Sequence, residues 1–423
     1  MERSYIEKLR PEKKVLIKGW IHEIRGLSKL KFILLRDNTG IVQCVVKEEL
    51  LKEIENLSLE SVVEIVGEVK EAKVKADFVL SNLEVFVHEL KILNKAEKLP
   101  IHVNEKTTNT DLMNRLDNRS LDLRKPEVAA RFRIQSTIIN GFREFFYKEG
   151  FMEIQPPGII ATSTEGGTDL FKIKYFDKDA YLAQSPQLYK QLMAISLEKV
   201  FSTGPIWRAE KHDTTRHINE IRQMDIEIGF CDDMQVMNYL EKSVQFIVKK
   251  ILKDCEKELK ILKLDLKVPK SKYLKYSEAL EILNKNGFKM KEGEDFDPSA
   301  EKKLCELFPN SIVFTYEWPS SIKPFYIWPK NEKVSGGFDA LYGGLEISSG
   351  GQRVHVAEIL IKQLKNKGLN PKDFSWYVDA FRYGAPMHSG WSIGLERLSQ
   401  AILGVENIRE VTLFPRDRRR LTP

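Results

Sequence analysis

The sequence predicts an α+β protein in which a small N-terminal β-barrel precedes a larger domain, built on a mainly antiparallel sheet flanked by helices. Residues 13–95 hold short segments rich in Val, Ile and Leu that are spaced like successive strands. Residues 131–423 alternate strand-like and helical stretches without the regular βαβ rhythm of a parallel sheet. Since 423 residues are too many for one ordinary core, we expect domains at 1–95 and 131–423, joined by a polar, turn-rich linker or hinge at 96–130.

The first domain contains five strand-like segments and one helical pattern, KEELLKEIENL, between the third and the fourth. The tight-turn signal Asp37-Asn38-Thr39-Gly40 separates the second segment from the third. Five strands with one intervening helix predict a closed barrel of the OB type, a common platform for nucleic acids. Another kind of small barrel, without a ligand, is the alternative that this segment alone leaves open.

The composition indicates a soluble globular protein of the cytoplasm. The chain is 42% hydrophobic and 30% charged, which excludes a disordered chain, and no apolar run approaches the roughly 18 residues of a membrane span. The start of the chain has no apolar secretory region. Four widely separated cysteines, without a CxxC pair, predict reduced thiols and not a zinc site. A net charge of +6 is compatible with a polyanion partner but does not require one.

Residues 205–230 predict a strand, a basic loop and a returning strand. Arg208 and Glu210 are two residues apart, so on a strand they project from one face. Asp225 and Glu227 share a face in the same way. The planar fork of arginine suits bidentate binding of phosphate oxygens. Such a hairpin therefore predicts a phosphate-binding surface, although a surface salt-bridge ladder is the alternative for this segment in isolation.

Two further segments show patterns of helix, strand and glycine that bear on function. Residues 142–159 read as an amphipathic helix, closed by a glycine, and then a strand that runs into Pro157. In residues 388–404, Gly390 and Gly394 permit close approach of the backbone to a ligand, just before an apolar-periodic helix. Because neither GxxxxGK[ST] nor GxGxxG occurs in the sequence, an ATP site must be built differently from a P-loop or dinucleotide fold.

Taken together and in this order, the three segments resemble the signature motifs of class II aminoacyl-tRNA synthetases. Pro157 matches the first motif, which in that family forms the dimer interface, so the resemblance implies a homodimer. Arg208-Ala209-Glu210 matches the RxE pattern of the second motif. The GxGxGxER pattern of the third motif is matched by Gly390, Gly394, Glu396 and Arg397, with Ser392 where the middle glycine is usual.

The resemblance narrows to the aspartyl members of the family. A barrel before the motifs is the arrangement of the aspartate, asparagine and lysine enzymes, and QSPQLYKQ at 184–191 is similar to the aspartyl signature. The anionic side chain of aspartate needs cations, for which Lys190 and Arg353 are the candidates. The aspartate site that the resemblance implies comprises Glu165, Gln187, Leu188, Tyr189, Lys190, Arg208, Asp225, Ser349 and Arg353. The FPRDRRRLTP ending is typical of archaeal and eukaryotic aspartyl enzymes.

The same resemblance implies an ATP site in which Arg208 neutralises the α-phosphate, Arg397 stacks on adenine and Glu210 accepts from the adenine amino group. These three are the expected catalytic residues. The implied ATP-binding set is Arg208, Ala209, Glu210, Arg216, His217, Ile218, Glu346, Gly394, Leu395, Glu396 and Arg397, with Mg²⁺ held by Glu346 and Ser349. Ile221 stands where related enzymes often place a phenylalanine that stacks on adenine.

For the barrel, the resemblance implies that Phe32 and Gln43 contact the middle anticodon base. Two more positions concern the choice between tRNA(Asp) and tRNA(Asn): His22 favours an enzyme that charges both, and Lys75 favours one that charges tRNA(Asp) alone. We expect the non-discriminating form, with ATP and L-aspartate as the other substrates and with neither DNA nor a membrane as a partner. The alternatives are an asparaginyl enzyme, a tRNA-independent ligase and a non-catalytic nucleic-acid-binding relative.

Overall fold

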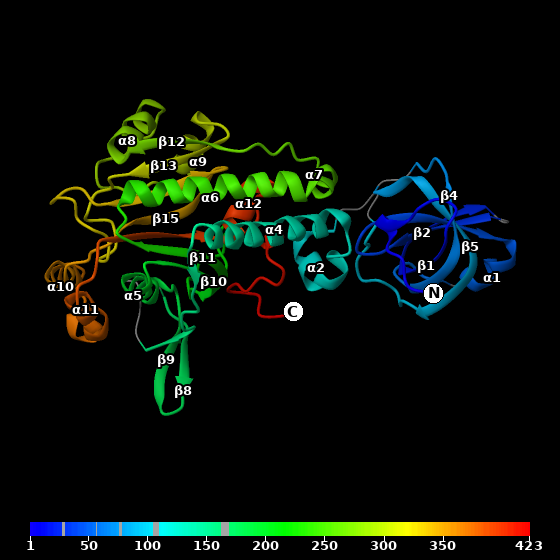
Figure 1. Ribbon diagram of the computed structural model, residues 1–423, viewed down its shortest axis with the longest axis horizontal. Coiled ribbons are helices and arrows are strands. Elements are labelled where there is room, and N and C mark those ends of the chain that lie inside the picture. Colours follow the sequence, from blue (N-terminus) through cyan, green and yellow to red (C-terminus); the bar gives the residue numbers. More distant parts are fainter. Residues whose placement is uncertain (28–29, 56, 76–77, 105–109, 162–168) are drawn as a thin grey trace. The chain divides into compact units, whose positions relative to one another are not determined.

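The computed structural model describes residues 1–27, 30–55, 57–75, 78–104, 110–161 and 169–423. The chain divides into two compact units, Met1–Ala129 and Ala130–Pro423 (Figure 1). Each unit has its own buried apolar cluster. Among the described residues, no helix is both long enough and apolar enough to cross a membrane.

The N-terminal unit is built on a closed five-stranded barrel of order β1-β2-β3-β5-β4, which confirms the OB-type barrel. The strands are β1 (Lys14–Leu27), β2 (Leu30–Arg36), β3 (Ile41–Lys47), β4 (Val62–Glu71) and β5 (Val79–Asn94), with α1 (Leu51–Ile54) between β3 and β4. Alternate residues of each strand fill the interior, as Ile33 and Leu35 do on β2. The turn into β3 is fixed by Asp37, whose Oδ1 accepts hydrogen bonds from the backbone N–H groups of Thr39 and Gly40.

The segment predicted as a linker or hinge contains two short helices, α2 (Leu112–Asp117) and α3 (Arg119–Asp122). Asp111 caps α2 through hydrogen bonds from two backbone N–H groups. Asp122 is buried and accepts from Arg119 and Arg115 at 2.7 and 2.8 Å. Hydrophobic periodicity did not predict these helices because charged pairs, and not an apolar stripe, hold them.

The C-terminal unit is built on an eight-stranded sheet of order β12-β13-β14-β15-β16-β11-β10-β6. Only β10 with β6 and β12 with β13 pair in parallel among these described strands, so the predicted mainly antiparallel sheet is confirmed. The strands are β6 (Met152–Glu153), β10 (Lys199–Trp207), β11 (Glu220–Gly229), β12 (Lys270–Lys275), β13 (Ser311–Tyr316), β14 (Gly337–Tyr342), β15 (Leu345–Gln352) and β16 (His388–Gly394).

Helices cover one face of this sheet and form the main core with it. The helices that do so are α4 (Pro126–Lys148), α6 (Asp233–Asp254) and α12 (Leu395–Leu403), and Figure 1 shows α4 and α6 running across the sheet. On β11, Met224, Ile226 and Ile228 enter this core, so the residues that alternate with them face the other side. The functional candidates lie on that second face.

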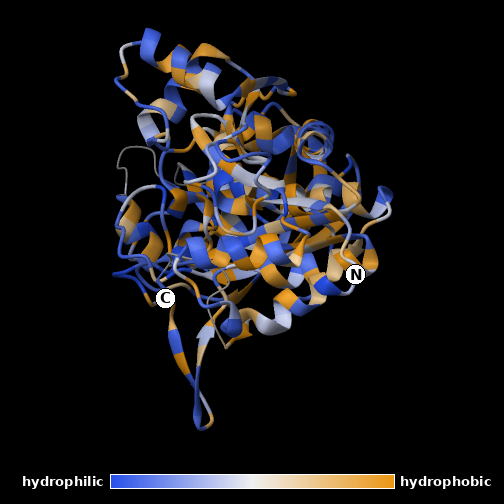
Figure 2. Cartoon of the chain, turned by 90° about the vertical axis from the view of Figure 1, so that its left-hand side faces the viewer, coloured by the Kyte–Doolittle hydropathy of each residue, from blue (hydrophilic) through white to orange (hydrophobic). Residues whose placement is uncertain are grey.

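The remaining elements surround the second face. They are α5 (Gln187–Leu197), α8 (Tyr276–Lys285), α9 (Pro298–Leu307), α10 (Ala357–Asn366), α11 (Ser375–Arg382) and the small sheet β7 (Ile159–Ile160), β9 (Lys178–Leu182) and β8 (Lys172–Tyr175). The helix α7 (Glu256–Leu262) follows α6 and instead packs Leu259 into the main core. Short 3-10 helices occur at Ile6–Lys8, Glu48–Leu50, Pro371–Phe374 and Ile408–Val411. Figure 2 shows hydrophobic and hydrophilic residues alternating along the helices, as amphipathic elements require.

Candidate active site

A polar row crosses the second face of the large sheet. Asp225 on β11 pairs with Ser392 on β16, Ser392 pairs with Ser349 on β15, and Ser349 pairs with Asp339 on β14. Directly paired residues of neighbouring strands point to the same face. Four strands therefore contribute side-chain oxygens to one line, and three of its members, Ser392, Ser349 and Asp339, line a cavity.

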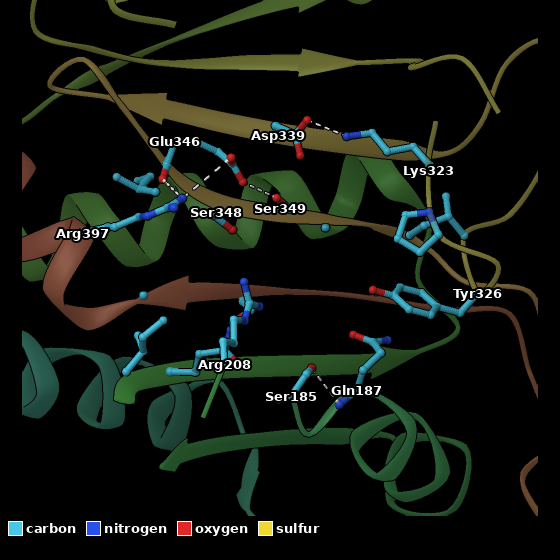
Figure 3. Close-up of a pocket in the computed structure, with 18 of the residues that line it drawn as sticks. Ser185, Gln187, Arg208, Lys323, Tyr326, Asp339, Glu346, Ser348, Ser349 and Arg397 are labelled. Carbon is cyan, nitrogen blue, oxygen red and sulfur yellow. Dashed lines mark hydrogen bonds and ion pairs between the residues drawn. The ribbon is translucent and has the colours of Figure 1, made fainter. Parts of the chain in front are cut away.

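The cavity above this row has a volume of about 380 Å³. Figure 3 shows Arg208 and Gln187 facing Glu346, Ser349 and Arg397 across it. Of the residues predicted from the sequence, the cavity is lined by Gln187, Lys190, Arg208, Glu210, Arg216, His217, Glu346, Ser349, Arg353, Gly394 and Arg397. Residues up to 210 positions apart in the sequence, from Gln187 to Arg397, thus meet at one site.

Two buried cations lie at one end of the cavity. Lys190 Nζ lies 3.0 Å from Asp225 Oδ1 and 3.7 Å from Glu227 Oε2. Arg353 binds the two oxygens of Glu227 through Nε and Nη2 at 2.9 and 3.2 Å. Burial opposes the charge of Arg353, but the Glu227 carboxylate raises the pKa of this guanidinium above its ordinary value. The two cations line the cavity, whereas Asp225 and Glu227 lie behind them.

Asn219 holds the loop that carries the second motif through hydrogen bonds to its backbone. Its Nδ2 donates to the carbonyl oxygens of Arg208 and Glu210 at 2.7 and 2.9 Å, which fixes the backbone that carries both side chains. The Nε of Arg208 is buried and has no hydrogen-bond partner among the described residues. A buried donor without a partner is costly, and a bound anion would satisfy it.

The same loop also contributes Arg216 and His217 to the cavity wall. Arg216 donates to Glu301 Oε2 and to the carbonyl oxygen of Gly344, each at 3.2 Å. His217 Nδ1 lies 2.6 Å from the hydroxyl of Thr214. Burial, and then the positive charge of Arg397, lowers the pKa of His217. His217 is therefore a neutral hydrogen-bonding group near neutral pH.

Carboxylates gather opposite Arg208, on β14 and β15. The Ser349 hydroxyl donates to Glu346 Oε1 at 2.5 Å, and Arg397 Nη1 donates to the Glu346 carbonyl oxygen at 3.2 Å. Asp339 pairs with Lys323 at 2.5 Å, as Figure 3 shows. Burial raises the pKa of Asp339. Burial also opposes the charge of Glu346, but Arg397, the Ser349 hydrogen bond and nearby cations together lower the pKa of this carboxyl.

Asp339, Lys323 and Glu301 are site residues that the sequence reasoning missed. A usable signal for Asp339 existed, because it is the one acidic residue in the otherwise buried strand GFDALY. Burial raises the pKa of Glu301 to about 7. Lys323 and Glu301 carry no local pattern, since only the packing of the chain brings Lys323 to the cavity wall and Glu301 to Arg216 in a neighbouring pocket.

Several residues of the predicted site lie around the cavity and not on its wall. Leu188, Ile218 and Leu395 are buried in apolar clusters. Ala209 donates its backbone N–H to the Asp169 carbonyl oxygen, and Tyr189 stacks on Trp376 with ring centroids 5.5 Å apart. Glu165 lies outside the described residues.

Glu396 also lies behind the wall. Its carboxylate accepts from the backbone N–H of Arg222 at 3.1 Å, so it joins the start of α12 to β11. Burial raises the pKa of Glu396 to about 7. The geometry places Glu396 as a brace for the neighbouring Arg397, whose side chain does reach the cavity.

In the barrel, Phe32 and Gln43 lie on neighbouring strands. Phe32 pairs with Val45 and Gln43 pairs with Leu34, so the two are diagonal neighbours on one face. That face is the outer one, because the residues that alternate with them fill the barrel core. Phe32 is half-buried, and Gln43 Nε2 donates to Glu84 at 2.9 Å.

The two residues predicted to govern tRNA choice have different environments. His22 is 6% exposed, and its Nδ1 lies 3.0 Å from Arg36 Nη1. Arg36 in turn forms a two-point ion pair with the buried Glu60 at 2.7 and 2.8 Å. Lys75 lies in the connection between β4 and β5 and is exposed.

Comparison with known proteins shows the family. Residues 111–418 match tRNA synthetases class II (D, K and N), and residues 15–93 match the OB-fold nucleic acid binding domain. The aspartate–tRNA(Asp) ligase of Pyrococcus furiosus is 47% identical over 428 residues, covering 97% of this chain and 96% of its own. The aspartate–tRNA(Asp/Asn) ligase of Methanopyrus kandleri is 43% identical over 436 residues and all of both chains.

The solved structures show the same architecture. Asparaginyl-tRNA synthetase from Pyrococcus horikoshii, complexed with asparaginyl-adenylate, has a TM-score of 0.94 at 34% identity over all of both chains. Aspartyl tRNA synthetase from Entamoeba histolytica has a TM-score of 0.90 at 32% identity, over all of this chain and 93% of its own. This chain therefore belongs to the class II tRNA synthetases of the D, K and N family, with an OB-fold domain before the catalytic fold, and the two curated relatives described above are archaeal aspartate–tRNA ligases.

Proposed function

We propose that this protein is an aspartate–tRNA ligase, which activates L-aspartate with ATP and transfers it to tRNA. The observation that carries this proposal is the pair of buried cations, Lys190 and Arg353, on the cavity wall. Their counter-carboxylates lie behind them, so the positive charges face the space that a substrate would fill. An anionic side chain forms charge-assisted hydrogen bonds with these cations, whereas the neutral amide of asparagine has a single acceptor oxygen and no charge. The fold alone does not separate the two substrates, since it matches synthetases of both kinds.

The chemistry needs no nucleophile from the protein. An oxygen of the aspartate α-carboxylate attacks the α-phosphorus in line, and the bond to the bridging oxygen breaks to release pyrophosphate. A ribose hydroxyl of the terminal tRNA adenosine then attacks the acyl carbon, and AMP leaves. Arg208 neutralises charge on the α-phosphate, and Arg216, His217 and Arg397 hold the outer phosphates and the base. Catalysis arises from positioning and charge stabilisation.

Mg²⁺ fits the oxygen donors present. Glu346 and Ser349 would hold it, and Asp339 supplies a second carboxylate whose pKa burial raises. Among the described residues, no group of three or more His, Cys, Asp or Glu side chains could hold a metal. This agrees with an ion that keeps waters and relies on one or two carboxylates plus substrate phosphates. When bound, Mg²⁺ neutralises phosphate charge; Arg208 and Arg397 provide fixed positive charge at the same site.

For the tRNA, we propose that residues 1–95 bind the anticodon, with Phe32 stacking on the middle base and Gln43 hydrogen-bonding to it, while 96–130 link this domain to the catalytic residues 131–423. We propose further that both tRNA(Asp) and tRNA(Asn) are charged, as His22 favours. The relatives include enzymes named for tRNA(Asp/Asn) and enzymes named for tRNA(Asp). Charging of purified tRNA(Asn) transcript with radiolabelled aspartate tests this, and no product would refute the relaxed specificity.

We propose a cytoplasmic homodimer that joins through α4 and β6. The short strand β6 is the last strand of the large sheet, and its Met152 is 54% exposed. Tyr147, near the end of α4, is 55% exposed. Exposed apolar groups beside a sheet edge favour a protein partner. Sedimentation equilibrium should give a mass near twice the 49.0 kDa of the chain.

The deciding experiment for activity is amino-acid-dependent ATP–pyrophosphate exchange with the full-length protein. We expect exchange with aspartate, and exchange with asparagine about a hundredfold slower, because hydrogen bonds to charged groups contribute about 1.5–3 kcal/mol each and asparagine lacks the carboxylate that would form them with the two cations. The reverse preference would identify an asparaginyl enzyme. Absence of exchange with either amino acid would identify a non-catalytic relative. Charging of tRNA then separates the proposal from a tRNA-independent ligase.

A further inference from the structure

A C-terminal segment, residues 408–420 (red in Figure 1), lies against the loop that joins β10 to β11. The loop comprises residues 208–219, between the end of one strand and the start of the next. Four side chains of this loop line the cavity: Arg208, Glu210, Arg216 and His217. The site predicted from the sequence includes no residue of the C-terminal segment, yet this segment contacts the loop at two places.

The first contact reaches the start of the loop through Asn219. The backbone N–H of Asn219 donates to the carbonyl oxygen of Arg416 at 2.7 Å. The carbonyl oxygen of Asn219 accepts from the N–H of Arg208 at 2.9 Å, and its Nδ2 donates to the carbonyl oxygens of Arg208 and Glu210. Asn219 is only 9% exposed, and hydrogen bonds shielded from water are electrostatically stronger. The C-terminal segment thus holds the backbone that carries Arg208 and Glu210.

The second contact reaches the middle of the loop through Thr214. Arg409 Nη1 donates to the carbonyl oxygen of Thr214 at 3.0 Å. The hydroxyl of Thr214 lies 2.6 Å from His217 Nδ1 and accepts from the backbone N–H of Arg216 at 3.2 Å. The residue that Arg409 holds therefore holds the other two cavity residues of the loop.

The C-terminal segment is itself fixed to the core of the larger unit. Ile408 and Val411 are buried in the main apolar cluster. Gln135 on α4 donates from Nε2 to the carbonyl oxygen of Val411 at 2.5 Å. The N–H of Ile408 donates to the carbonyl oxygen of Thr215 at 2.8 Å. The segment consequently joins a rigid part of the fold to the loop.

A buried ion pair closes this segment on itself. Arg409 Nε donates to Asp417 Oδ2 at 2.7 Å, and the two side chains are 8% and 5% exposed. Asp417 Oδ1 accepts from the backbone N–H groups of Arg419 and Arg420 at 2.9 and 2.8 Å. Burial opposes the charge of Asp417, but the hydrogen bond from Arg409 helps to lower the pKa of this carboxyl. The pair is therefore ionised at neutral pH.

The ion pair connects the two contacts with the loop. Arg409 contacts Thr214 directly. Asp417 follows Arg416 in the chain, so its position sets where the Arg416 carbonyl oxygen meets Asn219. A change at either member of the pair is transmitted to both contacts.

We propose that Arg409 and Asp417 are positioning residues, which act through Thr214 and Asn219 to hold the loop of the second motif in its catalytic geometry. Neither side chain belongs to the cavity wall, so the effect on catalysis is indirect. This effect rests on the proposed function, whereas the order of the loop is measurable without any substrate. A displacement of about 1 Å at Arg208 is enough to lower a rate about a hundredfold.

Hydrogen–deuterium exchange of the full-length protein without substrates tests the order of the loop. Asp417→Asn keeps the size of the side chain and an acceptor oxygen but removes the charge that binds Arg409. We expect amide exchange in residues 209–219 to become faster by roughly 10- to 150-fold, the factor that corresponds to one hydrogen bond between charged groups. Asn219→Ala, which leaves the ion pair intact, should accelerate exchange in the same residues.

ATP–pyrophosphate exchange tests the consequence for catalysis. Asp417→Asn should lower kcat about 10- to 100-fold, because Arg208 is displaced, and should change the KM for aspartate by less than about twofold. The KM for aspartate stays because Lys190 and Arg353, on α5 and after β15, lie outside the loop. A general loss of stability would not separate the two constants in this way.

Asp122→Asn is the matched control. Asp122 is also buried and pairs with Arg119 at 2.7 Å, but it lies in the N-terminal unit. We expect this variant to keep the wild-type amide exchange in residues 209–219 and the wild-type kcat. If Asp417→Asn leaves the loop as protected as in the wild type, or if Asp122→Asn disturbs the loop equally, the inference is wrong. If the wild type catalyses no pyrophosphate exchange, the proposed function fails, and the amide exchange of the loop still decides the inference.

Discussion

Lys190 Nζ lies 3.0 Å from Asp225 Oδ1, and each of the two side chains is only 2% exposed. The lysine comes from α5 and the aspartate from β11, and the lysine also donates to the carbonyl oxygen of Trp391 on β16 at 3.1 Å. One ammonium group thus joins a helix to two strands while it lines the cavity. The Lys190 ammonium group therefore both presents positive charge to a substrate and holds the elements of the site together.

Lys190→Met should therefore impair both stability and activity. Removing one partner of a buried ion pair costs about 3–5 kcal/mol, so the midpoint of urea unfolding should fall and aspartate-dependent exchange should be lost. Lys260→Met is the control, because Lys260 forms an exposed pair with Glu256 and exposed pairs contribute about 0–1 kcal/mol. If Lys190→Met catalysed aspartate-dependent exchange at the wild-type rate, the assignment of Lys190 to the aspartate site would be wrong.

Arg208→Ala should abolish adenylate formation and leave tRNA binding near normal. The buried Nε of Arg208 has no partner among the described residues, so the side chain is available for the α-phosphate. Pyrophosphate exchange and a filter-binding assay with tRNA measure the two properties separately. Arg222→Ala is the control, since Arg222 follows on β11 as an exposed residue. Exchange within about tenfold of wild type, a loss of only about 1.4 kcal/mol, would show that Arg208 does not stabilise the transition state.

Glu396 should make the stability of the protein depend on pH. Burial raises its pKa from an ordinary 4.5 to about 7, so the folded state binds this proton more tightly than the unfolded chain. The contribution of this proton to the free energy of unfolding is fully present below about pH 4.5 and is lost as the pH rises through about 7. Glu396→Gln keeps an acceptor for the Arg222 N–H but cannot ionise.

Urea unfolding of both proteins between pH 5 and pH 8 measures this effect. The free energy of unfolding of Glu396→Gln minus that of the wild type should grow across this range by as much as about 3 kcal/mol, the equivalent of the pKa difference. A difference that does not change with pH would show that Glu396 stays charged in the folded protein.

Phe32→Ala should weaken the binding of tRNA and leave the rate of amino-acid activation unchanged. Stacking of a base on an aromatic side chain contributes about 1–3 kcal/mol, so the KM for tRNA in aminoacylation should rise roughly 5- to 150-fold. Pyrophosphate exchange without tRNA should stay at the wild-type rate. Tyr5→Ala, another aromatic substitution in the same unit at a side chain that is 37% exposed, should leave both unchanged. An unaltered KM for tRNA in Phe32→Ala would place the anticodon elsewhere.

Local sequence patterns predicted much of this protein. Short segments rich in Val, Ile and Leu predicted the five barrel strands, and the pattern KEELLKEIENL predicted the helix between the third and the fourth, since both signals depend only on neighbours along the chain. Arg208 and Glu210 both line the cavity, but the prediction that they lie on a strand is wrong, because β10 ends at Trp207 and both residues lie in the loop that follows it. The barrel strands and their helix depend on φ, ψ and side-chain direction, which a short segment determines largely by itself.

The tertiary structure decided which side chains come together at the cavity. Strand register set the row from Asp225 to Asp339, because partners on other strands leave no trace in local periodicity. Packing brought Lys323 to the cavity wall and Glu301 to Arg216. The same packing turned Glu396 toward the Arg222 backbone and brought Arg409 to the Thr214 carbonyl oxygen. The sequence by itself determined the family and the residue types of the site. Long-range pairing decided which of those residues reach the cavity, because burial and hydrogen bonding depend on neighbours distant in the chain.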